Sequence, residues 1–202
     1  MSYKIVKNKD FLRVKTTKVA TLEEGQEIAI KLMEALGEIG VGIGLSANQI
    51  GIQKSVSIVH VRKDKPPIVL INPVITETSK EQLVYVEGCL SMPGKQANTL
   101  RKAKITVSTL NSPVPLIFGP DTNPVTNDSI GSDYGIMESV CVQHEIDHLN
   151  GMLMTDVRYS PPKQVEKKYG RNDKVLIEKG GETAYVKYKK AQDLINDGWK
   201  IL

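Results

Sequence analysis

The sequence predicts a mixed fold of helices and short strands, in one domain with a small appendage. Apolar residues recur at helical spacing in two segments, 21–39 and 136–150, as they do in amphipathic helices. Between these segments lie short apolar runs bounded by Gly, Pro and Asn, which are typical of strands. The 202 residues suffice for one domain with a buried core, and the hydrophobic (40%) and charged (25%) fractions are those of an ordinary globular protein.

The first half of the chain is expected to form one helix followed by four strands. Asp10–Lys18 is expected to be extended. The helix should begin at Thr21, because Thr21-Leu22-Glu23-Glu24 has the pattern of a capping box, and it should end at Gly40. A glycine-rich apolar stretch, Val41–Gly51, follows it. Strands are predicted at 55–61, 68–71, 83–86 and 104–110, with a loop at Cys89–Pro93.

The second half begins with a long irregular loop, predicted over Asn111–Gly135 from its four prolines and many Asn, Asp, Ser and Thr residues. The helix at 136–150 should end at Gly151. A short helix is expected to start at Ser160-Pro161-Pro162, with Ser as its cap and Pro in its first turn. The pattern after Gly170 predicts strand, strand, helix and strand, at 174–178, 184–187, 190–196 and 199–202.

Charge distinguishes a main domain, 1–160, from a small C-terminal module, 161–202. The module holds ten Lys/Arg and six Asp/Glu, whereas the main domain holds seventeen of each, so the module carries the whole net charge of +4. A basic segment can face nucleic acid or a ribosomal surface. Four extra charges are too few to define a basic patch, however, and are more typical of a solvated lysine-rich appendage.

The sequence also bears on the cellular compartment. No apolar run approaches membrane-spanning length, and the N-terminal segment lacks the apolar core of a signal peptide. We therefore expect a cytoplasmic protein with no membrane partner. In a reducing compartment a disulfide between Cys89 and Cys141 is not expected, so metal binding or catalysis is the competing use of these thiols.

The run Gln143-His144-Glu145-Ile146-Asp147-His148 carries the strongest chemical signal. Its two histidines are four positions apart, which places both imidazoles on one face of a helix. Two such imidazoles can bind one metal ion, and the glutamate that follows the first can act as a general base. A helix with two surface histidines is the alternative interpretation.

A catalytic site of this kind needs a third protein ligand, and the residues leave more than one answer. A metzincin pattern would require a histidine where the chain has Met154, so that pattern is excluded. Glu166 could serve as the downstream glutamate of a thermolysin-like enzyme. The thiolate of Cys89 is the other candidate, since Gly88 permits a tight backbone there and Pro93 stiffens the segment that follows.

Three motifs together resemble the signature of the peptide deformylases, and they occur in that family's order. They are Gly42-Ile43-Gly44-Leu45-Ser46-Ala47-Asn48-Gln49, Glu87-Gly88-Cys89-Leu90-Ser91 and Gln143-His144-Glu145-Ile146-Asp147-His148-Leu149. The resemblance covers roughly residues 5–158. It implies an α+β fold with small antiparallel sheets packed around a central metal-binding helix, to which the C-terminal module adds a small α/β appendage. It also implies a hydrolase that removes the N-formyl group from the initiator methionine of new polypeptides and releases formate.

The resemblance further implies roles for individual residues. The metal ligands would be Cys89, His144 and His148, holding one divalent ion; Fe(II) is expected, with Zn(II), Ni(II) or Co(II) as alternatives. Glu145 would move the proton, while the Gln49 side-chain amide and the Leu90 backbone N–H would stabilise the oxyanion. The substrate would contact Ile43 and Gly44 through the main chain, and Tyr85, Glu87, Met137, Val140 and Cys141 through the pocket.

The resemblance also defines the expected partners and the competing function. N-formylmethionyl peptides and nascent chains are the expected substrates. The expected location is the cytoplasm, with an organelle or the cytoplasm of a phage-infected host as alternatives. Ribosome contact through the basic C-terminal region is a further hypothesis. A deformylase-like binding protein with a structural metal is the competing interpretation, although such a protein would have no need for Glu145.

Overall fold

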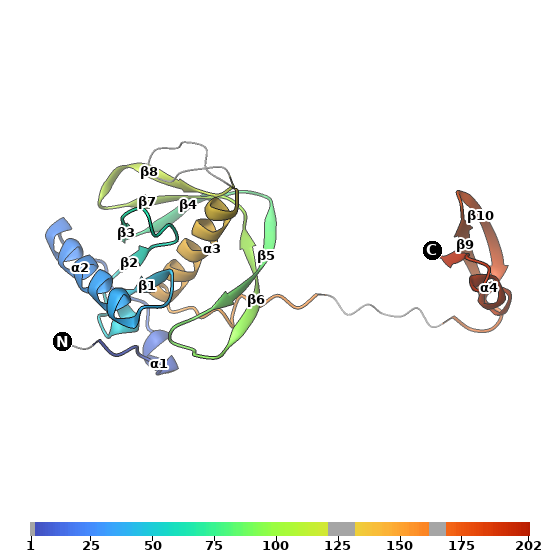
Figure 1. The fold of residues 1–202 in the computed structure, drawn as a ribbon, viewed down its shortest axis with the longest axis horizontal. Helices are drawn as coiled ribbons and strands as arrows, with labels where there is room; N and C mark the ends of the chain where they lie inside the picture. The colour runs from blue at the N-terminus through green and yellow to red at the C-terminus, as the bar shows by residue number, and fades with distance from the viewer. Residues whose placement is uncertain (1–2, 121–131, 162–168) are drawn as a thin grey trace. The chain divides into compact units, whose positions relative to one another are not determined.

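The computed structural model describes residues 3–120, 132–161 and 169–202. The chain divides into two compact units, Met1–Ser160 and Pro161–Leu202 (Figure 1). Within the described residues, no helix is both long enough and apolar enough to cross a membrane.

The first long helix, α2, spans Leu22–Ile39 and agrees with the prediction at both ends. The Thr21 hydroxyl accepts a hydrogen bond from Glu24 N (3.2 Å), and the Glu24 carboxylate accepts one from Ala20 N (2.8 Å). Gly40 ends the helix in the left-handed conformation (φ 70°), which a glycine adopts without strain. The apolar stripe of α2 is buried, which fixes the face that the helix turns to the interior.

A three-stranded antiparallel sheet lies next to α2, in the order β1-β2-β3. Its strands are β1 (Gly44–Ser46), β2 (Val56–Val59) and β3 (Ile68–Ile71), and a short 3-10 turn, Ala47–Ile50, follows β1. Every residue of β2 is buried, because the strand contacts both α2 and the second long helix, α3 (Ser132–Leu149). This sheet therefore forms the layer between the two helices.

Two further small sheets surround α3 (Figure 1). One has the order β4-β7-β8, with β4 at Val74–Thr78, β7 at Ile105–Thr109 and β8 at Ser112–Phe118. The other is the hairpin of β5 (Gln82–Gly88) and β6 (Gln96–Lys102). All strand pairs are antiparallel, and α3 contacts β1, β2, β6 and β8. The predicted α+β fold, with small antiparallel sheets around a central helix, is confirmed.

The predicted loop over Asn111–Gly135 is wrong at both ends. Residues 112–118 form β8, and α3 begins at Ser132. Pro113 and Pro115 are tolerated because β8 is an edge strand, whose outward groups need no partner in the ladder. Residues 121–131 of the predicted loop lie outside the described residues, as does the helix predicted to follow Ser160.

Three other local predictions also need correction. Asp10–Lys18 is not wholly extended, because Lys9–Leu12 forms a helical turn, α1, which Asn8 caps by accepting from Phe11 N (3.1 Å). The strands β4 and β6 were not predicted. In β6 buried and exposed residues alternate, but its buried positions include Thr99 and Arg101, so the strand lacks the apolar run that would have marked it.

The C-terminal unit is a three-stranded antiparallel sheet with one helix. Its sheet order is β10-β9-β11, and α4 packs against all three strands. The buried centre consists of Val175, Ile177 and Ala191. The order strand, strand, helix, strand agrees with the sequence prediction, with β9 at Lys174–Lys179, β10 at Glu182–Lys187, α4 at Tyr188–Ile195 and β11 at Lys200–Ile201.

The contact between α2 and β3 gives a first testable prediction. A Cβ atom on Gly25 would lie 2.6 Å from Ile71 Cγ2, whereas one on Gly37 would have no atom within 4 Å. We expect Gly25→Ala to lower the free energy of unfolding by about 1–2 kcal/mol through overpacking. Gly37→Ala, on the same helix, should raise it by about 0.5–1 kcal/mol through helix propensity. Urea denaturation measures both, and equal stabilisation by the two substitutions would contradict the close approach.

Candidate metal centre and active site

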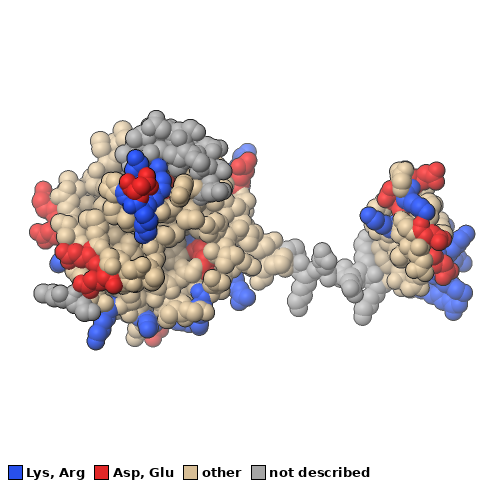
Figure 2. Space-filling view, in the orientation of Figure 1, with Lys and Arg blue, Asp and Glu red and all other residues tan. Residues whose placement is uncertain are grey.

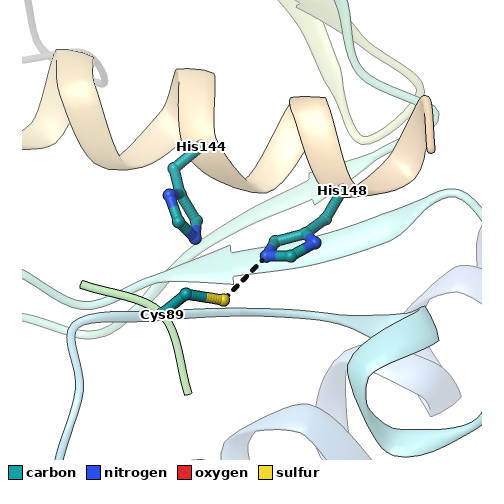
Figure 3. A group of neighbouring side chains, drawn as sticks. All are labelled: Cys89, His144 and His148. Carbon is teal, nitrogen blue, oxygen red and sulfur yellow. Dashed lines mark hydrogen bonds between the residues drawn. The ribbon is translucent and has the colours of Figure 1, made fainter. Parts of the chain in front are cut away.

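Three side chains that can bind a metal converge from two elements of the main unit. His144 and His148 lie one turn apart on α3, and Cys89 comes from the loop that follows β5 (Figure 3). Cys89 Sγ lies 3.2 Å from His148 Nε2, and the ligand atoms of all three residues lie within 4.8 Å of one another. The structure thus brings together the three residues that the resemblance implied as ligands.

Glu87 orients His144. Its Oε2 lies 2.6 Å from His144 Nδ1, so the carboxylate accepts the proton on that nitrogen. Arg101 donates to the same carboxylate from Nε (2.5 Å) and Nη2 (2.9 Å), and Thr99 donates through its hydroxyl. Burial would raise the pKa of Glu87, but the hydrogen bonds from His144 and Arg101 outweigh it and lower the pKa to about 2. Glu87 and Arg101 therefore form a buried ion pair.

Two contacts that the sequence did not predict hold α3 in place beside the hairpin. Arg101 Nη1 donates to Asp147 Oδ2 (2.5 Å), which joins β6 to the helix. Asn48 Nδ2 donates to the backbone oxygen of His148 (2.7 Å), which joins the turn after β1 to the same helix. Asn48 and Asp147 lie inside the motifs quoted above, and that position was the only signal that the sequence offered for them.

The two histidines differ in their protonation. Burial lowers the pKa of His148 to about 3, so its imidazole is neutral, the form that binds metals. For His144, burial also lowers the pKa, but hydrogen bonds with Cys89 and Glu87 outweigh it and raise the pKa to about 10. An ion on Nε2 of His144 would compete with that proton. One thiolate and two imidazoles form a donor set that fits Fe(II) or Zn(II).

Glu145 lies beside this cluster and is almost fully buried. Within the described residues its Oε2 has no hydrogen-bond partner, and burial raises the pKa of the carboxyl group to about 7. The approach of β1 to the helix is very close here, because a Cβ on Gly44 would lie 2.5 Å from Glu145 Oε1 and 2.6 Å from Cys141 Sγ. Only glycine leaves room for both side chains.

Gln49 points its amide nitrogen toward the cluster. Its Nε2 donates to Ser91 Oγ (3.2 Å) and lies 3.7 Å from Cys89 Sγ. Its Oε1 accepts from the backbone N–H of Ser46 (2.9 Å) and from the Ser46 hydroxyl (2.9 Å), which fixes the orientation of the amide. Leu90, the residue after Cys89, is half-buried in the wall of the same pocket.

A pocket of about 580 Å³ opens over the cluster. Its wall includes every residue that was expected to contact the substrate: Ile43, Gly44, Tyr85, Glu87, Met137, Val140 and Cys141. His148 lies deeper and is fully buried. The wall also contains residues that were not predicted, among them Val86, Met92 and Lys95; all three flank Cys89 in the chain.

Comparison with known proteins identifies the family. The profile of the family described as polypeptide deformylase matches residues 2–164. The chain belongs to this family. The peptide deformylase of Natranaerobius thermophilus is 36% identical over 159 residues, which are 77% of this chain and 92% of the relative. That of Borreliella burgdorferi is 34% identical over 151 residues, 73% of this chain and 81% of the relative.

A solved deformylase has the same fold. The structure of a class I type b peptide deformylase from Acinetobacter baumannii, bound to Met-Ala-Ser, aligns with a TM-score of 0.63 and 27% identity over 77% of this chain and 99% of that one. Peptide deformylases are metal-dependent hydrolases that act on formylated nascent peptides. This chain is accordingly an enzyme that removes the N-formyl group from the initiator methionine and releases formate.

The convergence on Cys89 gives a second prediction. Cys89→Ala should remove most of the bound metal, since it deletes one of three donors, whereas Cys141→Ala should leave one metal per chain. The measurement is the metal content of protein purified without oxygen, with circular dichroism as the test of folding.

Glu166→Ala is the matched test of the competing ligand, which lies outside the described residues. Retention of metal in folded Cys89→Ala, together with its loss in Glu166→Ala, would contradict the ligand set.

Proposed function

We propose that Cys89, His144 and His148 hold one divalent metal ion at the floor of the pocket and that Met1–Ser160 is the catalytic domain. The observation that carries this proposal is the convergence of the three donors beside Glu145. Fe(II) is the proposed metal, on the resemblance to the family; the donors themselves suit Zn(II), Ni(II) or Co(II) as well. When bound, such an ion polarises a carbonyl oxygen and lowers the pKa of water.

Glu145 is proposed to move the proton. A carboxyl group with a pKa of about 7 can accept a proton from the attacking water and later donate it to the leaving amine, both near neutral pH. The burial of Glu145 beside the donor cluster supports this role, because it places the carboxylate at the reacting centre and removes competing solvent. A structural metal site would not require such a residue.

Gln49 and Leu90 are proposed to stabilise the oxyanion that forms on the formyl oxygen. Ser46 already orients the Gln49 amide, so its N–H group needs no reorganisation during the reaction. The Leu90 backbone N–H would be the second donor, from the turn that starts at Cys89.

The substrate main chain is proposed to extend the β1 sheet. His60 N donates to Ile43 O (2.7 Å), so the main-chain groups of the next residue, Gly44, point away from β2 toward the free edge of the strand. A peptide could pair with that edge as an added strand. The Ile43 side chain would line the rim, while Met137, Val140, Cys141 and Tyr85 would contain the methionine side chain and Glu87 would hold His144 in place.

The proton-transfer role gives a third prediction. Glu145→Gln should lower kcat for formate release from formyl-Met-Ala-Ser by about 10²- to 10⁴-fold, while metal content stays at the wild-type level. Glu27→Gln, an exposed position on α2, is the matched control and should be fully active. Activity of Glu145→Gln within tenfold of wild type, with metal bound, would contradict the assigned role.

We further propose that the enzyme acts in the cytoplasm and that its C-terminal unit contacts the ribosome. Figure 2 shows Lys and Arg side chains on several sides of this unit. Lys174 and Lys187 face each other across β9 and β10, an arrangement of like charges that is unfavourable without an anion. Neither has an ion-pair partner among the described residues.

An exposed aromatic ring lies beside this lysine pair. Tyr185 is 73% exposed and pairs with Leu176, on the same face of the sheet as the lysines. Lysines around an exposed ring fit RNA, since they can bind phosphates while the ring stacks on a base. Ribosomal RNA is the proposed partner.

The fourth prediction concerns this face. The double substitution Lys174→Glu/Lys187→Glu should reduce co-sedimentation with ribosomes at low salt without changing formate release. Lys189→Glu/Lys190→Glu makes the same charge change on α4 instead of on the sheet, and it should reduce co-sedimentation with ribosomes less. Equal losses for the two variants would indicate diffuse attraction, and unchanged binding of Lys174→Glu/Lys187→Glu would rule out this face of the sheet as the contact.

A further inference from the structure

Lys95 is held at a fixed place on the rim of the pocket. It ends the loop 89–95 that begins with Cys89. Met92 N donates to Cys89 O (2.9 Å) and Lys95 N donates to Met92 O (3.1 Å), so two successive turns tie the Lys95 backbone to Cys89. Gly88 pairs with Gln96 across the hairpin and closes the loop. The fold therefore sets the position of the Lys95 backbone relative to the proposed metal ligands.

The charge of Lys95 is uncompensated. Of the carboxylates in the pocket wall, Glu87 and Glu145 are 5% and 3% exposed, and Glu87 is already bound by Arg101. Among the described residues Lys95 itself is exposed and has no ion-pair partner. Lys63 adds a second ammonium group near the rim, since its Nζ donates to the backbone oxygen of Gly42 (3.3 Å). A substrate thus passes a positive potential where it leaves the pocket.

We propose that Lys95 makes this enzyme select formylmethionyl peptides that carry an acidic side chain at the second or third position. The inference rests on the proposed function: with the formyl group at Cys89, His144 and His148, the residues after methionine must leave through the pocket mouth. An ion pair at an exposed rim changes affinity by about 1.4- to 5-fold, so attraction of Glu and repulsion of Lys together give about 2- to 25-fold discrimination. The interaction exists in the bound substrate and in the transition state alike, so it acts mainly on KM.

The test compares kcat/KM for two charge pairs of peptides, formyl-Met-Glu-Ser against formyl-Met-Lys-Ser and formyl-Met-Ala-Glu against formyl-Met-Ala-Lys, with formyl-Met-Ala-Ser as the neutral reference. Wild type should prefer the Glu peptide in at least one pair. Lys95→Gln should lose the preference and Lys95→Glu should reverse it. The preference should also shrink in 0.5 M NaCl, because salt screens exposed charges.

Lys80→Glu is the matched control, since it makes the same charge change at the other end of the same hairpin. The seven residues of β5 separate Lys80 from the loop, roughly 23 Å of extended strand and well beyond the Debye length. This variant should keep the wild-type preference.

The outcomes separate the inference from the function on which it rests. Failure of metal-loaded wild type to hydrolyse the neutral reference would overturn both. If the enzyme hydrolyses the neutral reference but shows no charge preference, the inference alone is overturned. The same holds if a charge preference exists and Lys95→Glu retains it. A preference abolished by Lys63→Glu and untouched by Lys95→Glu would overturn the assignment to Lys95.

Discussion

The buried carboxylate of Glu87 joins the two halves of the metal centre. It belongs to β5, and it binds His144 on α3 and Arg101 on β6, while Arg101 reaches on to Asp147 of the same helix. Buried charges of this kind are tolerated only when every partner is present, and removing one typically costs about 3–5 kcal/mol. The position of the hairpin, and with it the position of Cys89, therefore depends on this network.

A second constraint acts where β1 meets α3. Gly44 lets β1 approach so closely that no Cβ would fit between the strand, Glu145 and Cys141. Glu145 is consequently shut off from solvent, and burial raises the pKa of its carboxyl group to about 7. The absence of a side chain at Gly44 is thus what lets the strand pack directly against the carboxyl group of Glu145.

The C-terminal unit has a core of its own. Val175, Ile177 and Ala191 bury one face of its sheet under α4, and Tyr185 stays exposed on the other. The family match covers residues 2–164, so most of this unit lies beyond it. Its charge and its exposed ring are the observations on which the proposed RNA contact rests.

The sequence by itself determined the local features. The capping box at Thr21 and the spacing of His144 and His148 depend only on helix geometry, so they could be predicted without a fold. Residue chemistry alone could not choose between Cys89 and Glu166 as the third ligand, because Cys89 lies 59 positions before His148; the choice of Cys89 came from the resemblance. The strand β8, with its two prolines, was missed for a related reason. Metal sites and sheet edges are made by residues distant in the chain, and only the packing of the hairpin and the sheets against α3 decided which of them meet.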